Sequence, residues 1–157
     1  MRLAVTGHRP QKTGGYDEPN RLRLVAFARE QLAKLAPAQV ISGMALGWDQ
    51  AIAEAALDLD LPLLAAIPCD GQDSTWPFMS RRRYRELLGR PGVESHVVCP
   101  GSYKPYKMQV RNEWMVRQAD LLLALFDGTA GGTANCVAYA QTQGVKIVNV
   151  WNEWIAG

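Results

Sequence analysis

Short apolar runs alternate with longer amphipathic segments along the chain. The short runs predict strands, and the segments with apolar residues three and four positions apart predict helices. Strands are expected at residues 3–6, 40–42, 61–67, 95–99, 121–126 and 145–150. Helices are expected at residues 20–35, 47–59, 76–88, 105–119 and 133–143. The pattern therefore predicts strand and helix in alternation from one end of the chain to the other.

The expected strands are continuously apolar, as in the run LLLALF at residues 121–126. Such runs are typical of a parallel sheet that helices cover on both faces. The length of 157 residues fits one domain with one core. The predicted fold class is therefore α/β. We expect residues 1–157 to form a single doubly wound domain, with a mostly parallel sheet of about six strands flanked by helices.

Composition and charge exclude several classes of protein. Seventeen Lys and Arg against fifteen Asp and Glu leave a net charge of +2, too small a surplus to indicate nucleic acid or an anionic membrane by itself. No apolar run approaches the ~18 residues of a membrane span, and the run at residues 1–6 is too short for a signal peptide. Three cysteines without C-x-x-C spacing predict neither a disulfide framework nor a metal site. We expect a cytoplasmic protein that requires no cofactor.

Polar and glycine residues follow several of the expected strands. In an open parallel sheet, ligands bind beyond the carboxyl ends of the strands, where the direction of winding reverses. The ligand-binding candidates after the first, second and fifth strands are Thr6, Gly7, His8, Arg9, Ser42, Gly43, Met44, Asp49, Asp127, Gly128, Gly131, Gly132 and Thr133. The sequence thus predicts a ligand site at this edge of the sheet.

The segment after the fifth strand holds three glycines within five residues, directly before Thr133 at an expected helix start. Glycines there leave backbone N–H groups free to point at an anion, and the helix dipole favours negative charge. The alternative is a simple turn with Thr133 as the helix N-cap. No lysine follows as in a Walker loop, and the spacing differs from the dinucleotide fingerprint. We therefore predict a phosphate-binding loop that is not an ATPase loop.

Arg111 lies near the start of its expected helix and shares the apolar stripe with Met115. A guanidinium directed inward at the ligand edge is suited to bidentate binding of phosphate or carboxylate. The neighbouring Asn112 belongs to the same candidate set. We expect Arg111 to bind the anionic part of a ligand rather than to stabilise the fold. The alternative is a structural ion pair with Asp120 or Asp127.

Asp49 lies in the first turn of its expected helix, also on an apolar stripe. It could accept hydrogen bonds from a ribose hydroxyl or a base, with Ser42 and Gly43 letting the ligand approach the backbone. A carboxylate that only favours the helix dipole is the alternative. His8 and Arg9 could bind an anion, and His8 could transfer a proton or merely cap its loop.

A run of arginines at residues 81–85 is the only concentrated basic segment. Such runs are usually solvated helix faces or lie opposite an acidic partner, so nucleic-acid contact is not favoured. Trp48 and Trp76 are expected in loops that face the site, where either ring could stack on a base, although a tryptophan is more often part of a core or a subunit interface.

Residues 6–10 (TGHRP), 42–49 (SGMALGWD) and 111–133 resemble the YpsA-like branch of the SLOG superfamily, which also contains the LOG phosphoribohydrolases and the DprA recombination mediator. The resemblance covers nearly the whole chain. Its most specific part runs from Arg111 to Thr133 and has the order and spacing of LOG enzymes. Membership implies a Rossmann-like sheet with a pocket for a nucleotide or a nucleotide-derived ligand.

The chain departs from the LOG pattern after Gly132 and Thr133. LOG enzymes carry glutamates there, whereas this chain has Ala134, Asn135 and Cys136. An amide cannot take a proton or stabilise an oxocarbenium-like charge as a carboxylate does. The chain therefore has the arginine of the LOG pattern, Arg111, but lacks the glutamate that acts with it.

The leading hypothesis is therefore binding or sensing of a nucleotide, either a nucleoside phosphate or an ADP-ribose-like molecule. The enzymatic alternative is a hydrolase of N-glycosidic bonds in which Asp49 or Glu113 replaces the missing acid, with Arg111 as its partner. A nucleic-acid interaction module is a third possibility. We expect a homo-oligomer with a small-molecule partner and no membrane partner.

Overall fold

The computed structural model describes residues 1–157. Its strands are β1 (Arg2–Gly7), β2 (Gln39–Ser42), β3 (Leu63–Ile67), β4 (Val93–Val97), β5 (Leu121–Leu125) and β6 (Lys146–Asn149). Its helices are η1 (Pro10–Lys12), α1 (Glu18–Leu35), α2 (Trp48–Asp58), α3 (Phe78–Leu88), α4 (Pro105–Gln118), α5 (Gly132–Thr142) and α6 (Trp151–Ala156). None of these helices is both long and apolar enough to cross a membrane.

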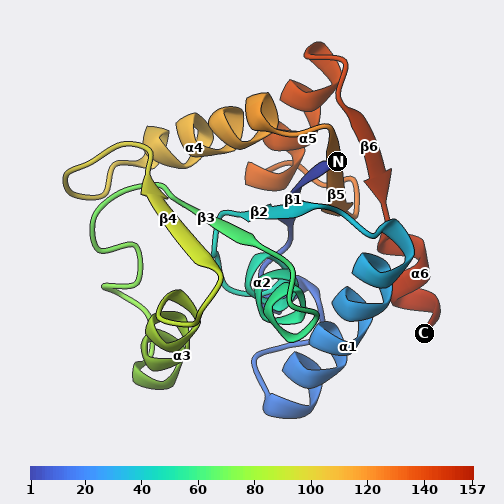
Figure 1. Cartoon of the computed structure of the whole chain (residues 1–157), viewed down its shortest axis with the longest axis horizontal. Helices are drawn as coiled ribbons and strands as arrows, with labels where there is room; N and C mark the ends of the chain where they lie inside the picture. Colours follow the sequence, from blue (N-terminus) through green and yellow to red (C-terminus); the bar gives the residue numbers. More distant parts are fainter.

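The six strands form one parallel sheet in the order β4-β3-β2-β1-β5-β6 (Figure 1). The chain winds outward from β1 to β4, then returns to the other side of β1 with β5 and continues to β6. The winding direction therefore reverses between β1 and β5. The predicted doubly wound, Rossmann-like α/β fold is confirmed.

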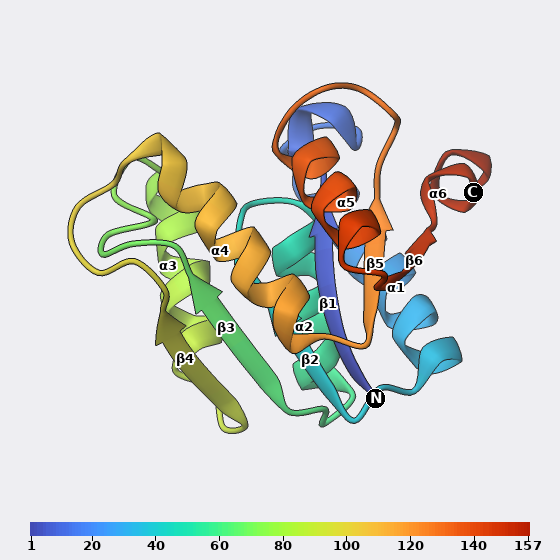
Figure 2. The ribbon, with the colours of Figure 1, turned by 90° about the horizontal axis from the view of Figure 1, so that it is seen from above.

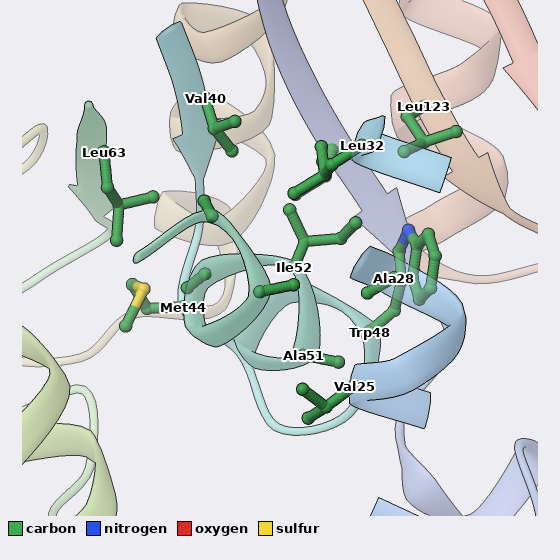
Figure 3. Packing of buried hydrophobic residues seen from close by; sticks show 14 of the residues in the cluster. Val25, Ala28, Leu32, Val40, Met44, Trp48, Ala51, Ile52, Leu63 and Leu123 are labelled. Atoms are coloured by element: carbon green, nitrogen blue, oxygen red, sulfur yellow. The ribbon is translucent and has the colours of Figure 1, made fainter. Parts of the chain in front are cut away.

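Two layers of helices cover the sheet. α4 and α5 lie on one face, and α1, α2 and α3 lie on the other, with α6 beside α1 (Figure 1). On the second face, side chains of α1 and α2 pack against residues of β2, β3 and β5, with Ile52 near the middle of the group and Trp48 beside Ala28 of α1 (Figure 3). Strands β1, β3 and β5 are buried on both faces, which explains their continuous apolar runs.

Several boundaries differ from the sequence prediction, and two elements were not predicted. β4 begins two residues before the expected strand at 95–99, because the exposed residues Glu94, Ser95 and His96 on this edge strand hide its apolar pattern. α6 was missed because no side chain caps its start at Val150. η1 falls in a segment expected to be irregular.

Replacing Ile52 by Ala tests the assignment of the core. The side chain is fully buried between α1 and the sheet, so the substitution leaves a cavity and should lower the free energy of unfolding by about 2–5 kcal/mol. Leu22→Ala, on the half-exposed side of α1, should stay within about 0.5 kcal/mol of the parent protein. Urea titration measures both, and equal losses would contradict this core.

Candidate functional site

The loops after the strands all gather at the carboxyl edge of the sheet, and the loops after β1 and β5 lie next to each other (Figure 2). Between them is a cleft of about 460 Å³, termed the central cleft. It is lined by Thr6, Gly7, His8, Arg9, Gln11, Lys12, Ala45, Asp49, Met108, Arg111, Asn112, Ala130, Gly131, Gly132 and Thr133. The cleft thus lies over the point where the winding reverses.

The start of α5 forms one wall of the central cleft. Its N-cap is Gly131, with φ at +145°, and no side chain caps the helix. The first bond of the helix joins the Asn135 amide to the Gly131 carbonyl at 3.0 Å. The amides of Gly132, Thr133 and Ala134 therefore have no acceptor within the protein. Thr133 is not the N-cap, so the sequence alternative of a Thr133-capped turn is wrong.

Three cations and one carboxylate line the same cleft. Arg9 is exposed, and its side chain makes no ion pair. Lys12 contacts the Thr129 hydroxyl and lies 3.8 Å from Asp127. Arg111 and Asp49 lie deeper, both buried. The excess of positive charge favours an anionic ligand.

The Arg111 guanidinium is held on two sides by the protein. Its Nη1 donates to the Gly43 carbonyl at 2.6 Å and to the Ala66 carbonyl at 3.2 Å. Its Nε donates to Asn112 Oδ1 at 3.0 Å. Nη2 has no acceptor in the protein, although Arg111 lines the cleft. These bonds join α4 to β2 and β3, so Arg111 contributes to the fold, contrary to the expectation from the sequence, and its Nη2 makes no bond within the protein.

Neither proposed structural partner of Arg111 contacts it. Asp120 accepts from the backbone amide of Arg2 at 2.8 Å, and Asp127 pairs with His8. The carboxylate that influences Arg111 is Asp49 on α2, whose charge opposes the fall in the pKa of Arg111 that burial causes.

Asp49 is almost fully buried, and its Oδ1 has no hydrogen-bond partner. Burial raises the pKa of Asp49 to about 6, against the opposing charge of Arg111 and the Ala45 amide. Asp49 is the only acidic residue that lines the central cleft. It is therefore an acceptor, or a proton donor when protonated, beside a cationic wall.

The loop after β5 is fixed to the loop after β1. His8 Nε2 lies 2.7 Å from Asp127 Oδ1 and 2.9 Å from the Asp127 amide nitrogen, and the Thr129 amide donates to Asp127 Oδ1 at 2.9 Å. The Thr129 hydroxyl contributes most to holding the pKa of Asp127 near 2, so this carboxylate is ionised. Burial lowers the pKa of His8 despite the nearby carboxylate. His8 and Asp127 thus form the anchor of the loop.

Ser42, Gly43 and Met44, which were predicted to contact a ligand, do not line the central cleft. Ser42 donates its hydroxyl to the Asp49 carbonyl at 2.8 Å, and Met44 is fully buried in the core. A side chain at Gly43 would overlap the Arg111 guanidinium. The glycine therefore makes room for Arg111 and not for a ligand.

Four other predicted residues lie outside the central cleft. Asp127 and Gly128 support the loop without lining the cleft. Glu113 accepts a hydrogen bond from Gln109 at 3.2 Å on α4, away from the cleft lining. Trp48 is fully buried against Phe27 on the α1 side of the sheet, so its expected place facing the site is wrong.

The central cleft also contains residues that the sequence analysis missed, namely Gln11, Lys12, Ala45, Met108 and Ala130. Lys12 had a detectable signal, because it is a cation in the long segment that follows the first strand. The others are contributed by the three-dimensional arrangement of loops and had no chemical signal in the sequence.

The chain matches the family model described as DNA recombination-mediator protein A over residues 15–155. It is 30% identical over 134 residues to the uncharacterised SPbeta prophage-derived protein YoqJ of Bacillus subtilis (strain 168), covering 76% of this chain and 78% of the relative. A UPF0398 protein of Bacillus thuringiensis (strain Al Hakam) is 24% identical over 168 residues, and the match covers 98% of this chain and 89% of that protein. DNA processing protein A from Helicobacter pylori, studied for its single-stranded DNA binding mode, has a similar fold, with a TM-score of 0.67 and 20% sequence identity. The structural match covers 99% of this chain and 72% of the Helicobacter pylori chain. The chain therefore belongs to the DNA recombination-mediator protein A family, within the SLOG superfamily.

Proposed function

We propose that the central cleft binds a nucleotide or nucleotide derivative through its phosphate. The observation that carries this proposal is the group of unbonded amides at the start of α5, which shares the cleft with Arg9 and with the free Nη2 of Arg111. Amides at a helix start and guanidinium groups are the donors that bind phosphate oxygens.

The size and chemistry of the cleft favour a nucleotide over a simple inorganic anion. A volume of about 460 Å³ leaves room beyond a phosphate group. Asp49, with one oxygen unpartnered, provides an acceptor for the hydroxyl groups of a sugar or the amino group of a base.

Mass spectrometry of small molecules released from freshly purified protein tests the proposal directly. We expect a phosphate-containing nucleoside derivative to co-purify. Isothermal titration with nucleoside monophosphates then measures the affinity. Absence of binding across purine and pyrimidine monophosphates and ADP-ribose would reject a nucleotide ligand.

Single-stranded DNA is a second candidate. The recombination-mediator family and the single-stranded DNA binding of the Helicobacter pylori protein favour it, and they give nucleic acid more support than the charge of the chain alone did. The same amides and cations would serve backbone phosphates. Fluorescence anisotropy with a labelled oligonucleotide tests this, because binding through phosphates weakens steeply as salt increases. Displacement of the oligonucleotide by a mononucleotide would assign both ligands to the central cleft.

Hydrolysis of an N-glycosidic bond is the enzymatic alternative, and Asp49 is the observation that favours it. The position after Gly132 and Thr133 offers no acid, since Asn135 is exposed and Cys136 is buried with a pKa raised to about 11. Asp49, with a pKa of about 6, could transfer a proton near neutral pH. Release of free base from nucleoside monophosphates, abolished in Asp49→Asn, would establish this activity.

Gly132→Val tests the phosphate loop. A Cβ at this position meets no protein atom within 4 Å, so the fold should be unaffected, whereas the side chain would occupy space at the amides that bind phosphate. We expect nucleotide affinity to fall on the order of tenfold or more by calorimetry. Gly89→Val, at the far end of α3, should bind as the parent does. Unchanged affinity in Gly132→Val would show that the loop assignment is wrong.

The pH dependence of stability tests the environment of Asp49. Its pKa is about 6 when folded and 3.8 ordinarily, so the native state binds more protons than the unfolded state between these values. The stability of the parent protein relative to Asp49→Asn should therefore decrease as pH rises from 3.8 to about 6. Denaturant titrations at several pH values measure this difference, and a difference that rises or stays level would contradict the assigned pKa.

A further inference from the structure

A second cleft, of about 330 Å³, lies on the β3–β4 side of the central cleft and is termed the outer cleft. It is built from the loop after β3, residues 68–76, and from Tyr103 in the loop after β4. Arg9 and Met108 line both clefts, so the two spaces adjoin. Figure 2 shows these two loops together at the same edge of the sheet as the loops of the central cleft.

Two aromatic side chains line the outer cleft. Trp76 is half-buried and packs edge-on against Tyr84, with ring centroids 5.1 Å apart, so its position is fixed. Tyr103 is 58% exposed, and a ring that exposed has most of its surface available to a ligand. Aromatic surfaces of this kind stack on nucleobases.

The polar groups at the base of the outer cleft are also held in place. Gln72 donates from Nε2 to the Gly43 carbonyl at 2.9 Å and accepts from the Tyr84 hydroxyl at 3.1 Å. The Gly43 carbonyl is the acceptor that Arg111 also uses. The Gly43 carbonyl therefore connects Gln72 of the outer cleft to Arg111 of the central cleft.

The distance between the clefts determines the size of ligand that can use both. The start of α5 follows β5, whereas the outer cleft lies beyond β3, three strand positions away in the sheet order. At about 4.8 Å per strand, this separation is roughly 14 Å. The sugar and base attached to a phosphate at the start of α5 therefore do not occupy the outer cleft. The outer cleft is available to a second unit of the ligand.

We propose that the outer cleft binds a second nucleobase, joined through phosphate to the nucleotide in the central cleft, with Tyr103 and Trp76 as its stacking surfaces. This inference rests on the proposed function. Arg9, a cation with no ion-pair partner on the boundary between the clefts, faces the linking phosphate. The ligand class is thus a nucleotide with two bases, linked either by a phosphodiester, as in a DNA strand, or by a pyrophosphate.

Calorimetry with matched ligands tests this inference. The probes are adenosine monophosphate, adenine dinucleotides with a 3′–5′ phosphodiester or a 5′–5′ pyrophosphate link, and the same dinucleotides lacking the second base. In the parent protein, at least one complete dinucleotide should bind on the order of tenfold more tightly than its abasic analogue. The linkage that shows this gain identifies the source of the ligand.

Variants of two exposed tyrosines test whether Tyr103 provides the gain in affinity that comes from the second base. Tyr103→Ala should abolish the difference between the dinucleotide and its abasic analogue without weakening adenosine monophosphate, and Tyr103→Phe should retain it. Tyr106→Ala, on α4 and outside both clefts at 62% exposure, should behave as the parent does.

Two results would overturn the inference, and they differ from each other. If adenosine monophosphate binds but the second base adds nothing for either linkage, or if Tyr103→Ala keeps the full gain, the outer cleft is not a base site and the proposed function stands. If no mononucleotide or dinucleotide binds, the proposed function itself fails and this inference fails with it.

Discussion

The hydrogen bonds from Arg111 to the Gly43 and Ala66 carbonyls fix α4 to the ends of β2 and β3. Burying a guanidinium costs several kcal/mol unless hydrogen bonds and an opposing charge compensate. Here two carbonyls, the Asn112 side chain and the field of Asp49 provide that compensation. Because these groups come from separate elements, one side chain joins α4 to the ends of β2 and β3 beneath the central cleft.

The same arrangement explains why Asp49 and Arg111 do not simply neutralise each other in a close ion pair. Arg111 uses Nη1 and Nε within the protein, and Asp49 keeps one oxygen without a partner. A buried carboxylate oxygen without a hydrogen-bond partner reduces stability. The unpartnered oxygen of Asp49 at the reversal of winding is therefore a cost to the fold that a hydrogen-bond donor on a ligand would offset.

The fold could be predicted from the sequence because its strands are short apolar runs and its helices are amphipathic. The edge of the sheet that carries the central cleft also followed from topology, since parallel strands end together. The roles of Gly43 and Met44 could not be predicted, because a glycine after a strand can admit a ligand or a neighbouring side chain such as Arg111. Trp48 was misplaced for a related reason, since an aromatic residue at a loop boundary gives no indication of which face it will join.

The anchor between the loops after β1 and β5 has a consequence for the thermodynamics of recognition. Contacts among His8, Asp127, Thr129 and Lys12 hold the first residues of the glycine-rich segment. A loop that orders only on binding would lose conformational entropy at that step and reduce the affinity. In this protein the entropy is lost when the chain folds, so the amides at the start of α5 are preorganised for an incoming anion.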